Sequence, residues 1–97
     1  MKIAWDTTFT DADGKEVQKG KEGALTLKDM ATTALHQMVQ QDQQMDGEEK
    51  FKMGALAHKI ISDPSGEFEV EEVALIKKRI GFLYGPLLVF QAYNALK

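Results

Sequence analysis

The sequence predicts an α+β fold that is mainly helical, with about four helices, an N-terminal β-hairpin and a small antiparallel sheet. An internal similarity predicts two of the strands: residues 23–31 and 66–74 each begin with a glycine, continue with an alternating apolar pair and an acid, and lead into a helical pattern. Two such units place short strands near Leu25 and Phe68 side by side, each followed by a helix on the same core.

The first residues alternate apolar and polar side chains on either side of a turn. β-Forming residues flank Asp13-Gly14, and a glycine in this position supplies the positive φ of a tight hairpin turn. We therefore expect a β-hairpin over residues 1–17. The polar stretch that follows contains two glycines and three charged residues, which predicts an exposed connection over residues 18–24.

The remaining residues, 25–97, are predicted to form a helical core because their apolar side chains recur at three- and four-residue spacing. Thr26 and Asp29 have the spacing of a capping box at the start of the first helix, and Asp46 precedes the second. Pro86 is well placed as the first residue of the fourth. The second helix is apolar over more than half of its circumference, so we expect it to be central and buried on two sides.

Length and composition indicate one ordinary globular domain spanning residues 1–97. The chain has 43% hydrophobic and 28% charged residues, and its length permits a single core. Cysteine is absent, which excludes disulfides, zinc-thiolate sites, iron-sulfur clusters and cysteine nucleophiles.

Charge and hydropathy argue against nucleic-acid and membrane partners. The net charge is -3, and the one dense basic run, Lys77-Lys78-Arg79, is interpreted as a solvated face because its members point in different directions on a helix. The longest strongly apolar run, residues 86–90, is far shorter than a membrane span. An acid at Asp6 interrupts any signal-peptide pattern, so we expect a cytoplasmic protein.

No catalytic constellation is visible, and the protein is not expected to be an enzyme or to carry a cofactor. His36 and His58 do not have the spacing of a helical metal pair. Adjacent carboxylates such as Glu71-Glu72 are explained by their places near helix starts. The glycines lack the strand-turn-helix context of a phosphate loop.

One alternative is a degenerate EF-hand-like module that responds to a divalent cation. Gly66, Phe68 and Glu72 have the offsets of the sixth, eighth and twelfth positions of a calcium loop. Ile61 takes the place of the first acidic ligand, however, and a proline follows Asp63. The cation-binding residues of this alternative are Asp63, Ser65, Glu67 and Glu72.

The C-terminal residues 82–93 offer more apolar side chains than one short helix buries on one face. Either this helix closes the core, or part of it forms an exposed apolar patch for a partner or for a second copy of the chain. Tyrosine tolerates a half-wet boundary. The predicted partner-binding anchors are Tyr84, Leu87, Phe90 and Tyr93.

Four motifs resemble a group of small, mostly uncharacterised proteins encoded by tailed bacteriophages and prophages. The matching residues are Leu25 to Asp29, Gly47 to Lys50, Val70 to Lys78 and Tyr84 to Leu88. The motifs are architectural and carry over no catalytic residue. The resemblance implies a role in particle assembly or in binding a host factor, in the cytoplasm of a bacterial host.

The leading hypothesis is therefore a non-enzymatic phage or prophage protein that binds a host or phage protein. The cation-responsive module is one alternative. A homo-oligomeric structural protein is the other.

Overall fold

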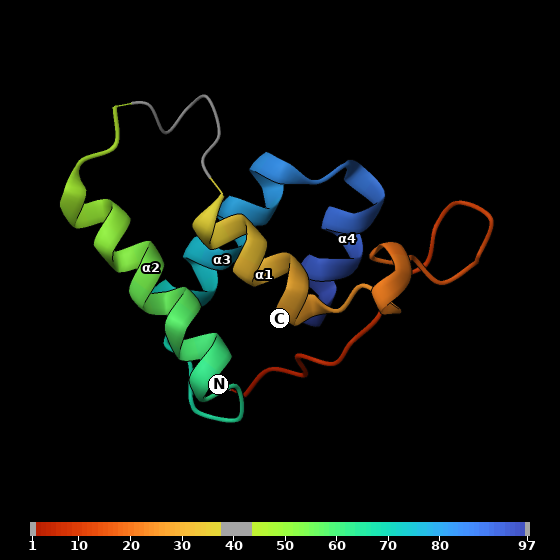
Figure 1. Cartoon of the computed structure of the whole chain (residues 1–97), viewed down its shortest axis with the longest axis horizontal. Helices are drawn as coiled ribbons and strands as arrows, with labels where there is room; N and C mark the ends of the chain where they lie inside the picture. The colour runs from red at the N-terminus through yellow and green to blue at the C-terminus, as the bar shows by residue number, and fades with distance from the viewer. Residues whose placement is uncertain (1, 38–43, 97) are drawn as a thin grey trace.

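Four α-helices and one short 3-10 helix, η1, make up the regular structure of the computed structural model, which describes residues 2–37 and 44–96 (Figure 1). No membrane-crossing helix is found within these residues, since none is long and apolar enough. The elements in chain order are η1 (Gly20–Glu22), α1 (Leu27–His36), α2 (Gly47–Ser62), α3 (Val70–Leu83) and α4 (Pro86–Ala95).

Side-chain caps explain where the helices begin. The capping box predicted for α1 is present: Thr26 Oγ1 accepts from the Asp29 backbone N–H, and the Asp29 carboxylate accepts from the Thr26 N–H at 3.0 Å. Asp46 accepts from the N–H of Glu49 at 2.8 Å at the start of α2. α4 begins with a proline, whose fixed φ suits the first helical position.

The predicted α+β class is wrong, because the described part of the chain is all-α and contains no β-strand. Extended pairing is limited to three isolated antiparallel bridges, Thr8 with Thr26, Thr10 with Glu16, and Gln18 with Ala24. None of the bridges continues into a neighbouring pair, so no ladder forms and the hairpin over residues 1–17 is absent as a strand pair.

The predicted strand near Phe68 is missing for a related reason. Phe68 is buried, and its ring meets the edge of Trp5 at a centroid distance of 5.2 Å. Trp5 and Ile3 are buried while Ala4 and Asp6 are exposed, so the alternation in the sequence is real. The alternating side chains are buried in the common hydrophobic core rather than in a sheet, and a turn at Trp5 and Asp6 interrupts the extended backbone.

The core is centred on α1, which packs against both α2 and α3, while α3 also packs against α4. The prediction of a central second helix is wrong. α2 lies at one side of the molecule (Figure 1), and its side chains Phe51 and Ile61 are 75% and 59% exposed. The buried residues of α1 are Leu27, Met30, Ala31, Ala34 and Leu35.

Candidate binding surfaces

The four predicted anchors divide into two exposed and two half-buried residues. Leu87 and Phe90 are 46% and 66% exposed. They are three residues apart in α4, a spacing that places side chains next to each other on one side of a helix. We call these two residues the α4 patch.

The hydroxyl groups of the two tyrosines form hydrogen bonds with other parts of the fold. Tyr93 Oη donates to the carbonyl oxygen of Lys77 at 2.8 Å. Gly81 makes room for this contact, because a Cβ at this position would lie 3.0 Å from Tyr93 Oη. Burial raises the pKa of Tyr84 above its usual value, although a hydrogen bond with Thr33 opposes the shift. Tyr84 and Tyr93 therefore fix the position of α4 and flank the patch as partly buried residues.

A side-chain amide ties α4 to the N-terminal segment. Gln91 Oε1 accepts from the Thr10 N–H at 3.0 Å, and Gln91 Nε2 donates to the Thr10 carbonyl at 2.9 Å. One amide thus satisfies both backbone groups of Thr10, in the manner of a neighbouring strand. This contact joins residues 81 positions apart. It holds α4, which carries the patch, against the N-terminal segment.

A second surface is the α2–α3 groove, which consists of two adjoining hollows of about 500 Å³ and 430 Å³. Both hollows are lined by Lys52 and Leu75, so they form one continuous depression between the two helices. The groove lining at the end near the start of α2 is Gln44, Met45, Glu49, Lys52, Met53, Leu75, Lys78, Arg79 and Phe82. The lining at the other end is Phe51, Lys52, Ala55, Leu56, Lys59, Glu71, Glu72 and Leu75.

Arg79 was expected on a solvated face and is instead the one buried charged side chain among the described residues, at 2% exposure. Its Nε donates to the carbonyl of Ala34 at 3.0 Å and its Nη2 to that of Gln37 at 2.9 Å. A cation at these carbonyls satisfies backbone acceptors and complements the negative end of the α1 dipole. The signal in the sequence is its position next to Ile80 and three residues after Ile76, within the apolar row of α3.

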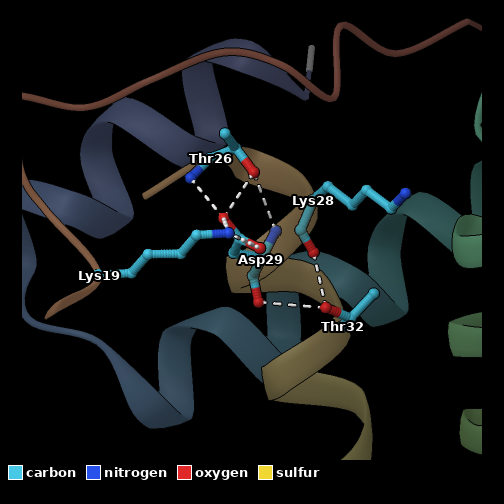
Figure 2. Close-up of polar contacts among 5 residues, drawn as sticks. All are labelled: Lys19, Thr26, Lys28, Asp29 and Thr32. Carbon is cyan, nitrogen blue, oxygen red and sulfur yellow. Dashed lines mark hydrogen bonds and ion pairs between the residues drawn. The ribbon is translucent and has the colours of Figure 1, made fainter. Parts of the chain in front are cut away.

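The opposite end of α1 is held by an acidic residue (Figure 2). Asp29 accepts from Thr26 Oγ1 at 2.8 Å and from Lys19 Nζ, which forms an ion pair with it at 3.0 Å. Burial alone would raise the pKa of Asp29, but the hydrogen bonds from Thr26 and the Lys19 ammonium outweigh burial and lower it. In Figure 2 the Lys28 side chain extends away from this cluster, while its carbonyl accepts from Thr32 Oγ1 at 2.8 Å. The cluster therefore joins the N-terminal segment to α1.

The residues of the cation-binding alternative do not converge. Glu72 accepts from the Glu69 N–H at 2.7 Å and from Lys59 Nζ at 2.9 Å, and these two contacts lower its pKa although burial raises it. Asp63, Ser65 and Glu67 are exposed. Across residues 2–37 and 44–96, no three His, Cys, Asp or Glu side chains are grouped so that they could hold a metal ion.

Residues 2–37 and 44–96 form a four-helix, all-α structure with two apolar surfaces, the α4 patch and the α2–α3 groove. Comparisons with models of known protein families, with curated proteins and with solved structures find no match to this chain. Its function is therefore argued from these two surfaces.

Proposed function

We propose that this protein is a non-enzymatic binding protein of a bacteriophage or prophage, and that it docks a protein partner on the α4 patch in the cytoplasm of the bacterial host. The observation that carries the proposal is the exposure of Leu87 and Phe90 side by side on one helix. Apolar side chains of this size, presented together on a fixed element, are typical anchors of protein interfaces.

The fixed position of α4 supports this role. The hydroxyl of Tyr93 and the amide of Gln91 join the helix to α3 and to Thr10. A surface held in its binding conformation loses little conformational entropy when a partner docks. The α4 patch is therefore suited to rigid recognition.

The phage context comes from the sequence resemblance. Three of its four motifs coincide with helix starts: Leu25 to Asp29 spans the cap of α1, Gly47 to Lys50 is the first turn of α2, and Val70 to Lys78 opens α3. The fourth, Tyr84 to Leu88, contains the patch residue Leu87. The partner is accordingly either a host protein or another phage protein.

The test is affinity capture of the tagged protein from bacterial lysate, from uninfected and from phage-infected cells, followed by mass spectrometry. We expect one protein in stoichiometric amount that is lost with the double variant Leu87→Ala/Phe90→Ala. The matched control is Asn94→Ala, an exposed change on the same helix, and unchanged thermal unfolding verifies the fold. Retention of the same protein by the double variant would exclude the patch as the binding site.

A second candidate function is a homo-oligomeric structural protein, and the exposure of Phe51 and Ile61 on α2 favours it. A second copy that covered these side chains would remove both from water. Light scattering at increasing protein concentration tests this candidate. A rising mass that Phe51→Glu abolishes would support it, and a constant monomer mass would exclude it.

A further inference from the structure

The α2–α3 groove lies between two helices that both pack against α1 but make little contact with each other. Met53 and Leu56 are buried at the base of the groove, and Leu75 is half-buried beside them. Phe82 is partly exposed at one end. The groove thus has an apolar base that extends along the length of α2.

Charge is distributed unevenly along this groove. Among the described residues that line the end near the start of α2, the charged side chains are Lys52, Lys78 and the buried Arg79 on one hand and Glu49 on the other. At the other end Lys59 is already paired with Glu72, and Glu71 is exposed. The described lining of the first end therefore carries more positive than negative side chains, in a chain whose net charge is -3.

The two exposed lysines are available to a ligand. Within the described residues no ion pair joins Lys52 or Lys78 to an acidic side chain, and Lys78 Nζ lies over the ring of Phe82, 6.0 Å from its centroid. Lysine stems lie along apolar surface while the ammonium stays in water. Both cations can therefore reach a carboxylate that lies above the apolar base.

We propose that the α2–α3 groove binds an amphipathic helix of another protein, with its apolar face on the groove and acidic side chains at the end that meets Lys52 and Lys78. A groove between two helices has the shape to accept a third helix, whose side chains at three- and four-residue spacing enter the groove. Charge complementarity fixes the direction of the ligand. This site lies on different helices from the α4 patch and is independent of it.

The probe is a fluorescein-labelled synthetic peptide of about 18 residues, five turns of helix, with leucines along one face and two glutamates near one end. The matched peptide has lysines in place of the glutamates. Fluorescence anisotropy is measured with the full chain at low and at high salt. We expect the glutamate peptide to bind about tenfold more tightly, the difference produced by two exposed charge pairs of about 0.7 kcal/mol each, and salt to reduce the difference.

Charge reversal gives the decisive comparison. The variant Lys52→Glu/Lys78→Glu changes two exposed side chains and is expected to prefer the lysine peptide instead. Leu87→Ala/Phe90→Ala should bind both peptides as the unmodified chain does, so failure of the α4 patch and failure of the groove give different results. Circular dichroism establishes that each variant is folded.

Three outcomes would overturn the proposal. The first is equal affinity for the two peptides, or no binding of either at millimolar concentration. The second is a preference for the glutamate peptide that the charge-reversed variant retains. The third is a concentration-dependent mass that the charge-reversed variant abolishes, which would identify a second copy of the chain as the occupant of the groove.

Discussion

The helices α1 and α2 differ in the fraction of their side chains that is buried, and their own sequences do not predict this difference. α1 has 10 residues, and five of them are buried between two other helices. α2 has 16 residues and buries four, on one side. Both have capped starts, but Arg79 also binds the carbonyl end of α1. Compared with α2, α1 is therefore the more central helix because it packs against both α2 and α3, and apolar length alone does not decide which helix is central.

The largest expected effect is the loss of the Arg79 contact with the end of α1. Arg79→Ala should lower the free energy of unfolding by about 2 to 6 kcal/mol, because the buried carbonyl of Ala34 and the partly buried carbonyl of Gln37 each lose a donor, at about 1 to 3 kcal/mol each. Urea denaturation measures the change. The matched control is Lys78→Ala, an exposed neighbour, which should change stability by less than about 0.5 kcal/mol. Similar values for the two variants would mean that Arg79 does not hold α1.

The next prediction compares one apolar side chain from each helix. Met30→Ala removes a fully buried side chain of α1 and should cost about 2 to 4 kcal/mol. Phe51→Ala removes a larger side chain of α2 that is mostly exposed, and should cost less than about 1 kcal/mol. Both values come from urea denaturation of the monomer. A large loss for Phe51→Ala would show that Phe51, in the lining of the α2–α3 groove, is covered in solution.

A smaller effect is expected at the start of α1, and it depends on pH. Asp29→Asn should cost about 1 kcal/mol at pH 7, because the charged cap and the Lys19 ion pair are lost. The pKa of Asp29 is lowered in the folded protein, so its contribution is present above the usual value of 3.8 and is lost as the pH falls through the lower folded value. Urea denaturation should therefore show a smaller difference between the variant and the unmodified chain at pH 3 than at pH 7.

The smallest expected effect is that of calcium. Glu72 is engaged by Lys59 and by the Glu69 N–H, so millimolar calcium should leave the midpoint of thermal unfolding unchanged relative to a chelator. A ligand that binds only the folded state raises the midpoint. A rise that Glu72→Gln abolishes would restore the cation-responsive alternative.

Local signals predicted the helices well and the N-terminal part poorly. The Thr26 and Asp29 spacing marks the start of α1, and Pro86 marks that of α4, because caps act within one turn. Alternation at Ile3 and Trp5 correctly indicates which side chains are buried, but it does not say whether a strand or a helix covers them. Whether a segment pairs as a strand depends on residues far away in the sequence. In this protein Ile3 and Trp5 are buried in the same core as the helices.

The candidate surfaces were likewise predictable from the sequence only in part. Leu87 and Phe90 could be selected from the sequence because apolar residues were in excess in the last helix. The inward direction of Tyr93 depends on the gap at Gly81 and on the Lys77 carbonyl, which belong to a different helix. The α2–α3 groove depends on how two helices diverge from α1, and no local pattern encodes that.

The packing of Trp5 against Phe68 gives the protein an optical reporter at one defined place. Trp5 is the sole tryptophan of the chain, and it is buried at the point where the N-terminal segment meets the residues before α3. An indole removed from water emits at shorter wavelength than a solvated one. Its emission maximum therefore follows detachment of the N-terminal segment separately from helix melting, which circular dichroism records, and shows whether the two events coincide.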